Sequence, residues 1–260
     1  MDSIPITRDM AIEACKSMKD FHGKLIDLYS KHDMDLASNR GRRNVLMSAP
    51  MEHFLAKSIK DSGNFYSVQA DGRTGEADIT IYTEPGRPLE LECKLTSPQQ
   101  SSGSIAFQTD HDTLKNKGSL DYVYIIANEN FDSFCFLYFK DLTIDDFRSL
   151  SPGARGKVQM YKWSGMKKAT VLVGEAISSN DTKIDKITNA LKERIEQKAS
   201  QLGNWKEELK TVASESKKNI LSQKIINGLD YIDNAVNKVA NDVRIITQNN
   251  ARYSFKYESV

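Results

Sequence analysis

A stretch of the chain, "GEADITIYTEPGRPLELECKLTS" over residues 75–97, holds two β-like runs that carry charged side chains. In the second run Glu92 and Lys94 alternate with apolar residues, so they share one face of a strand. If the two runs pair as a hairpin around "EPGRP", Asp78 from the first run approaches both of them. Two carboxylates forced together raise each other's pKa unless a cation holds them. The stretch therefore contains the residues of a site for a divalent ion.

The donor atoms indicate which ion such a site prefers. Carboxylate oxygens with no cysteine or histidine cluster nearby favour Mg²⁺ or Mn²⁺ over Zn²⁺. The ammonium group of Lys94 can orient and polarise a water beside a scissile phosphate and stabilise the charge that develops there. The chemistry indicated is metal-assisted hydrolysis of a phosphodiester. The alternative is that the same alternation marks only the solvated face of an antiparallel hairpin.

Strands must position these residues, and period-two patterns predict a mixed sheet of five or six strands flanked by helices. Between the second and third runs lies a segment with strand and helix character, residues 105–118, which predicts a parallel crossover between those two strands. The fold class expected is α/β. The six runs are "ADITIYT", "PLELECKL", "DYVYIIAN", "SFCFLYF", "KVQMYKW" and "ATVLVG".

Apolar residues at helical spacing predict two helices before the strands and two or three after them. The second N-terminal helix is expected to begin near Ser48, with Pro50 in its first turn and Glu52 beside its apolar stripe. Toward the C-terminus, apolar residues recur every three or four positions amid Lys and Glu. We therefore expect a core domain over residues 1–175 and a mainly helical region over residues 176–260.

The arrangement resembles the PD-(D/E)xK nuclease superfamily, which has a restriction-endonuclease-like fold with a central mixed sheet. The resemblance covers roughly residues 45 to 140 and is carried by Asp78 and by the triplet Glu92-Cys93-Lys94; an alanine stands where the motif's name has a proline. It implies that Asp78, Glu92 and the main-chain carbonyl of Cys93 bind the metal. It also implies that Lys94 acts on the attacking water and that Glu52 is the helical catalytic carboxylate of some members.

Glu90 lies on the same strand face and is a rival metal ligand, although its spacing to Lys94 does not fit the triplet. Candidate DNA contacts come from the segment "DLASNRGRRN" and from the region after the catalytic strand, because arginines and amides bind phosphates and base edges. Solvated surface, loop and cap roles are the alternatives for these polar residues. The candidates are Arg40, Arg42, Arg43, Gln108, Thr109 and Lys115.

The family resemblance implies a Mg²⁺-dependent endodeoxyribonuclease, with Mn²⁺ as a substitute, that hydrolyses double-stranded DNA. A type II restriction enzyme is the first expectation. A repair, resolvase or defence nuclease of the same fold is one alternative, and a non-catalytic DNA-binding or assembly protein is another. Cleavage at a symmetric site calls for a homodimer. The C-terminal helices are candidates for dimerisation or for embracing DNA, with packing inside one chain as the alternative. A restriction system further implies a DNA methyltransferase that is not a stable subunit.

Composition limits these expectations. The 260 residues include 36 Lys and Arg against 35 Asp and Glu, so any site for a polyanion must be a local patch. No GxxxxGK[ST] motif is present, which argues against an ATP-driven translocase. Three scattered cysteines argue against a disulfide framework and a zinc site. Apolar runs too short to span a bilayer, and no export signal at the N-terminus, favour a cytoplasmic protein without a membrane partner.

Overall fold

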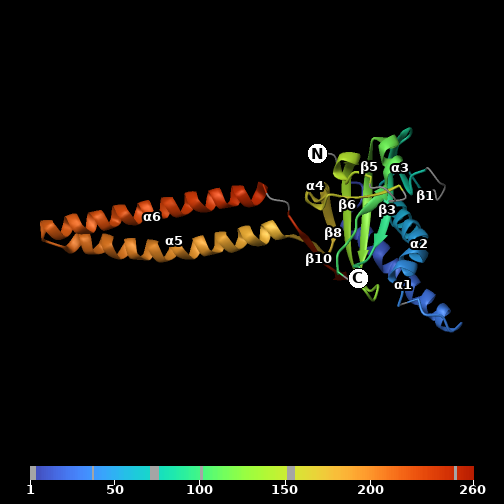
Figure 1. Ribbon diagram of the computed structural model, residues 1–260, viewed down its shortest axis with the longest axis horizontal. Helices are drawn as coiled ribbons and strands as arrows, with labels where there is room; N and C mark the ends of the chain where they lie inside the picture. The colour runs from blue at the N-terminus through green and yellow to red at the C-terminus, as the bar shows by residue number, and fades with distance from the viewer. Residues whose placement is uncertain (1–3, 37, 71–75, 100–101, 151–155, 249–250) are drawn as a thin grey trace. The chain divides into compact units, whose positions relative to one another are not determined.

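The structure is a computed structural model, and it describes residues 4–36, 38–70, 76–99, 102–150, 156–248 and 251–260. The chain is a mixed α/β protein that divides into two compact units, drawn together in Figure 1. One unit, the core unit, comprises the chain up to Ala176 together with Tyr253–Val260. The other, the helical unit, is Ile177–Arg252.

Within the described residues, the core unit is built on a seven-stranded sheet. β3 and β5 run parallel and the other neighbouring strands run antiparallel, so the predicted mixed sheet is confirmed. The crossover from β3 to β5 contains β4 (Gln108–Asp110) and α3 (His111–Lys117), as the pattern of that segment indicated. Across the sheet lie β1 (Ser67–Ala70), β2 (Ile79–Glu84), β3 (Arg87–Thr96), β5 (Ser119–Ala127), β6 (Ser133–Thr143) and β11 (Glu258–Ser259), with β8 (Ala169–Val173) also paired to β6.

Both faces of the sheet are covered. The helices α1 (Arg8–Ser30) and α2 (Arg40–Asp61) pack on the face where Leu91 and Cys93 of β3 are buried (Figure 1). On the other face the segment before β4, together with α3 and β7 (Lys157–Gln159), contributes to a second core that is rich in aromatic residues. The alternation predicted for β3 is therefore present: its apolar residues face the helices, and its charged residues face the second layer.

The helix α2 begins earlier than the sequence pattern predicted. It starts at Arg40, and not near Ser48, because the side chain of Asn39 accepts a hydrogen bond of 2.9 Å from the main-chain N–H of Arg42 and caps the helix. Pro50 consequently lies inside the helix, where it removes one main-chain donor, and not in its first turn. The arginines of the segment "DLASNRGRRN" therefore lie in the first turns of α2.

Short elements complete the core unit. Only the first three residues of the predicted strand "KVQMYKW" form a strand, β7, which pairs with β4 in a separate two-stranded sheet and not in the main one. The tail Tyr253–Val260 folds with the core unit, although we expected it in the helical region, because β11 pairs with β6. The other elements are η1 (Ile144–Asp146), α4 (Lys162–Gly165), η2 (Met166–Lys168) and β9 (Glu175–Ser178), which pairs with β10 (Tyr253–Lys256).

The helical unit is a hairpin of α5 (Ser179–Thr211) and α6 (Glu215–Gln248), shown at full length in Figure 1. Its amphipathic pattern was expected from the sequence. The two helices bury little: along α5, which is described throughout, the one buried residue is Asn180. Several large apolar side chains of α6 are exposed, namely Ile220, Ile226, Leu229, Tyr231, Val236 and Ile245. No helix in the described ranges is long and apolar enough to cross a membrane.

Candidate active site

Asp78 is positioned by the β2–β3 hairpin. In the antiparallel register Ile79 pairs with Leu91, so Asp78, directly before β2, lies opposite the charged end of β3. Its Oδ2 atom accepts a hydrogen bond of 2.7 Å from the main-chain N–H of Cys93. The side chain is 21% exposed. The carboxylate is therefore held in one orientation by the backbone of the neighbouring strand while part of it reaches solvent.

Lys94 lies between the two carboxylates of the motif. Its Nζ atom is 3.8 Å from Asp78 Oδ2 and donates a hydrogen bond to Glu92 Oε1. Burial works to lower the pKa of Lys94, but the negative charges of Glu92 and Asp78 outweigh it and raise that pKa. Lys94 is accordingly an ammonium ion at neutral pH. The hairpin brings the three side chains together, as its alternation predicted.

Glu92 sits against an aromatic wall. Burial raises the pKa of its carboxyl; the charge of Lys94 opposes this rise and that of Asp78 adds to it. In the parallel register Glu92 pairs with Tyr122 of β5, whose hydroxyl is 2.7 Å from the hydroxyl of Thr109. Thr109 is 3% exposed. The prediction that Thr109 contacts DNA is therefore wrong, because its side chain is buried and its hydroxyl is hydrogen bonded to that of Tyr122.

Glu52 reaches the same site from α2. Its pKa rises to about 7, chiefly because the carboxyl is partly buried and next because Asp78 is near, while Lys94 works against the rise. The hydroxyl of Ser48, one helical turn earlier, donates a hydrogen bond of 3.4 Å to Glu52 Oε1. Sequence reasoning did not assign Ser48 to the site, although its spacing of four residues from Glu52 places both on one helix face. Together these four ionisable groups form the acidic cluster: Glu52, Asp78, Glu92 and Lys94.

Two other carboxylates nearby have different partners. Glu90, the rival ligand, forms an ion pair with Lys117 at 2.6 Å. Asp110 contributes to the raised pKa of Glu92, but its own side chain caps α3 by accepting a hydrogen bond of 2.9 Å from the N–H of Thr113. The triplet spacing and the geometry thus agree in favouring Glu92 over Glu90.

The donor atoms of the acidic cluster fit a hard divalent cation. Asp78, Glu92 and the main-chain carbonyl of Cys93 supply oxygen, which Mg²⁺ and Mn²⁺ prefer. Burial is the main cause of the upward pKa shifts of Glu52 and Glu92, and the neighbouring negative charges add to it. Over the ranges that the structure describes, no three side chains of His, Cys, Asp or Glu are grouped closely enough to hold a metal by themselves. The cluster therefore offers two carboxylates and a carbonyl, with Glu52 outside the ligand group.

Arg43 has a structural role and not the DNA contact expected of it. The side chain is buried, with the residue 1% exposed. Its guanidinium donates hydrogen bonds to Ser97 Oγ at 2.9 Å, to the carbonyl of Asn128 at 3.2 Å and to the carbonyl of Glu129. It also lies over the ring of Phe131, 5.0 Å from its centroid. Arg43 thus ties α2 to the end of β3 and to the β5–β6 connection, out of reach of a polyanion.

Arg40 lies at the surface of the same region. It donates a hydrogen bond of 3.1 Å to the carbonyl of Pro98 and forms an ion pair with Glu129. Its side chain is 17% exposed, whereas that of Glu129 is 71% exposed. Arg40 therefore presents a partly accessible positive charge. The remaining DNA-contact candidates are exposed on the core unit: Arg42, Gln108 and Lys115.

Comparisons with models of known protein families, with curated proteins and with solved structures find no match for this chain. Roles for its residues must therefore come from their own geometry and chemistry. The structure supplies three such facts: a mixed sheet, a motif hairpin that brings its charged groups together, and a helical carboxylate whose charge interacts with theirs.

Proposed function

We propose that the chain is a divalent-metal-dependent endodeoxyribonuclease of the PD-(D/E)xK type, built on a restriction-endonuclease-like core. One observation carries the proposal: Lys94 Nζ is hydrogen bonded to Glu92 on the same strand and lies 3.8 Å from Asp78 Oδ2, at the start of the neighbouring strand. A charged face that served only solubility would spread such side chains into water. Here their exposed fractions are 32% for Lys94, 15% for Glu92 and 21% for Asp78.

Each residue has a task in this mechanism. Asp78, oriented by the Cys93 N–H, and Glu92 supply carboxylate oxygens for the ion. When bound, Mg²⁺ supplies Lewis-acid stabilisation of the phosphate and of the attacking water. The Lys94 ammonium orients that water and stabilises the charge that develops on the phosphate. Glu52, with a pKa near 7, can exchange a proton with water at neutral pH.

The proposed substrate is double-stranded DNA, and the proposed role is that of a type II restriction enzyme in the cytoplasm, with a separate methyltransferase protecting the host DNA. Such an enzyme cuts both strands of a symmetric site, which calls for two copies of the active site. The helical unit is our candidate for the contact between copies, because α6 exposes large apolar side chains such as Leu229 and Val236.

Plasmid cleavage tests the proposal. The purified protein should cut unmodified supercoiled DNA in Mg²⁺ or Mn²⁺ and not in a chelator. The variants Asp78→Asn and Lys94→Met should each lose at least about a thousandfold in rate, because each removes a charge that acts in the transition state. The matched control is Glu90→Gln, on the same strand face but paired with Lys117, and it should cut at the wild-type rate.

Full activity of Asp78→Asn or Lys94→Met would remove the assignment. The pattern of products separates the two nuclease roles. Discrete bands on a defined plasmid support a restriction enzyme, and cuts confined to branched substrates support a structure-specific nuclease. A protein that binds DNA with no divalent-ion dependence and never cuts it would be a binding module.

A further inference from the structure

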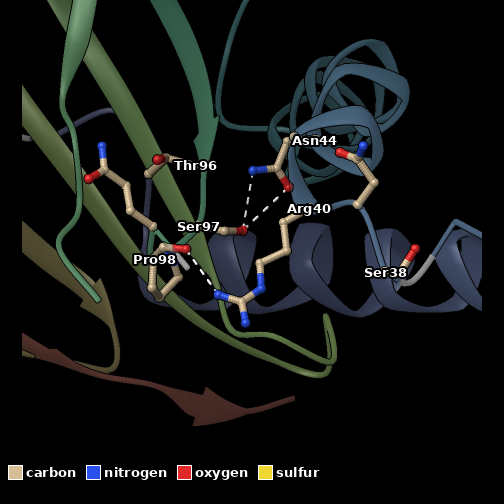
Figure 2. A pocket seen from close by; sticks show the side chains of 9 residues that line it. Ser38, Arg40, Asn44, Thr96, Ser97 and Pro98 are labelled. Atoms are coloured by element: carbon tan, nitrogen blue, oxygen red, sulfur yellow. Dashed lines mark hydrogen bonds between the residues drawn. The ribbon is translucent and has the colours of Figure 1, made fainter. Parts of the chain in front are cut away.

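A hollow of about 480 Å³ lies between the start of α2 and the segment that follows β3. Figure 2 shows it from close by, with Arg40 and Asn44 on the helix side and Thr96, Ser97 and Pro98 on the strand side. We propose that this hollow, the α2–β3 hollow, binds a phosphate group of the DNA backbone beside the cleavage site. The inference rests on the proposed function and extends it to the substrate.

The chemistry of the lining favours a small anion. The hollow contains hydroxyl and amide groups and one basic side chain, Arg40, and no carboxylate is among its described lining residues. The hydroxyl of Ser97 and the amide of Asn44 are within hydrogen-bond distance of each other, at 3.2 and 3.3 Å, and so form a prearranged polar pair. The guanidinium of the buried Arg43 donates a hydrogen bond to Ser97 Oγ and so holds that side chain in place. A guanidinium beside neutral donors suits a phosphate oxygen.

The ion pair between Arg40 and Glu129 shows that this guanidinium can bind an anion. Arg40 already holds an anion, the carboxylate of Glu129, which reaches it from the β5–β6 connection. The Glu129 carboxylate is largely exposed, so it can turn into water when another anion takes its place at Arg40. A phosphate that enters the hollow would replace it there.

The position of the hollow relative to the acidic cluster indicates a backbone phosphate. Asn44, Ser48 and Glu52 follow each other at four-residue intervals along α2, so Asn44 is about 12 Å along the helix axis from Glu52. Thr96 shares a strand face with Lys94 and lies two residues, about 7 Å, further along β3. A DNA strand that places one phosphate at Lys94 would bring a neighbouring phosphate to the hollow.

Binding of a labelled DNA duplex to the full chain, without divalent ions so that no cleavage occurs, tests this inference. We expect Arg40→Gln to weaken binding about tenfold, because a charge-assisted hydrogen bond is lost. The slope of log affinity against log salt should also fall by about one, as for one lost phosphate contact. Glu129→Gln should strengthen binding, because it removes the competing carboxylate.

Two further variants distinguish the loss of a phosphate contact from a loss of folded protein. Arg87→Gln removes an equally charged residue at the other end of β3, 80% exposed and away from the hollow, and should change binding less than twofold. Asn44→Asp keeps the shape of the side chain but adds a negative charge to the lining. It should weaken binding as Arg40→Gln does, with an unchanged circular dichroism spectrum.

The outcomes separate this inference from the nuclease proposal. If Arg40→Gln and Arg87→Gln bind alike while Asp78→Asn abolishes cleavage, the hollow is not a phosphate site and the nuclease stands. If Arg40→Gln loses binding, Arg87→Gln does not, and neither the wild type nor any variant cuts DNA, the phosphate site is supported and the nuclease proposal is refuted. Binding of inorganic phosphate that requires Arg40, without any binding of duplex, would overturn the assignment to DNA.

Discussion

The carboxylate of Asp78 accepts a 2.7 Å hydrogen bond from the main-chain N–H of Cys93, the middle residue of the motif triplet. This single bond couples the start of β2 to the charged end of β3. Because it uses one oxygen of Asp78 to hold the carboxylate still, it preorganises the other oxygen of that side chain for a ligand.

Two substitutions at Asp78 should separate this structural bond from the charge. Asp78→Ala removes the acceptor and should lower the free energy of unfolding by about 1–2 kcal/mol. Asp78→Asn keeps an oxygen for the Cys93 N–H and should stay within about 0.5 kcal/mol of wild type. Urea unfolding with and without Mg²⁺ is the measurement. Both variants should lose the stabilisation by Mg²⁺, and an undiminished effect of Mg²⁺ on Asp78→Asn would show that the ion binds elsewhere.

Glu52 should make the metal-free protein less stable as pH rises. Its folded-state pKa of about 7 exceeds the ordinary value of 4.5, so the folded protein holds this proton more tightly than the unfolded chain. That contribution is complete below about pH 4.5 and is lost as pH rises through 7. After allowance for solvent screening of a partly exposed carboxyl, it amounts to about 1 kcal/mol. Unfolding measured from pH 5 to 8 should show this fall, and Glu52→Gln should flatten it. An identical pH profile in that variant would contradict the assignment.

Replacing Lys94 should destabilise the protein most at high pH. Lys94→Met leaves Asp78 and Glu92 without their cation, at a cost of about 1–3 kcal/mol at pH 8. At pH 5 the cost should shrink, because Glu92, whose pKa is raised by burial, is protonated more readily than an ordinary carboxyl. The control is Lys117→Met, which breaks the more exposed pair with Glu90 and should cost little at either pH. Equal losses at pH 5 and 8 would argue against repulsion between the carboxylates.

Substitution of Arg43 should lower the free energy of unfolding and leave the affinity of the folded protein for DNA unchanged. Arg43→Met leaves Ser97 and two carbonyls without their donor, and we expect a loss of about 1–3 kcal/mol in the free energy of unfolding. Arg43→Lys should recover only part of it, because an ammonium cannot reproduce the planar fork. Thermal unfolding measures both. A stable Arg43→Met variant with a specific loss of DNA affinity would instead place Arg43 at the interface.

The homodimer proposal predicts a concentration-dependent mass for the full chain. Leu229 and Val236 are seven residues apart on α6, so they lie on one helix face, and both are exposed. Leu229→Glu with Val236→Glu should shift sedimentation toward the monomer, because a charge in an apolar contact is costly. The charge-matched control is Asn219→Glu with Asn237→Glu, at exposed positions that are already polar, and it should leave the mass unchanged. A wild-type monomer at all concentrations would rule the contact out.

Local pattern was enough to predict the hairpin, because alternation alone fixes which side of β3 carries Glu92 and Lys94 and a short turn fixes that Asp78 lies opposite. The parallel β3–β5 pairing could be predicted for a similar reason, since the crossover segment showed both strand and helix character. These features depend on neighbours in sequence.

Features that depend on distant partners could not be predicted. Arg43 looks like its exposed neighbour Arg42 in the sequence, and the hydrogen-bond acceptors that accompany its burial, Ser97 and the carbonyls of Asn128 and Glu129, are all distant in the chain. The start of α2 was placed too late because Pro50 is typical of a first turn, whereas the Asn39 cap and tertiary packing carry the helix through it. Thr109 likewise acquires its role from Tyr122 on another strand.

The pairing of β11 with β6 determines which deletions leave the core unit intact. Since the chain leaves the core unit after Ala176 and returns to it at Tyr253, the α5–α6 hairpin is an insertion and not an appendage. A truncation at residue 176 would strip an edge strand from the sheet along with the helices. Excision of residues 179–251, with a short linker in their place, removes the hairpin and leaves every strand of the main sheet in the core unit.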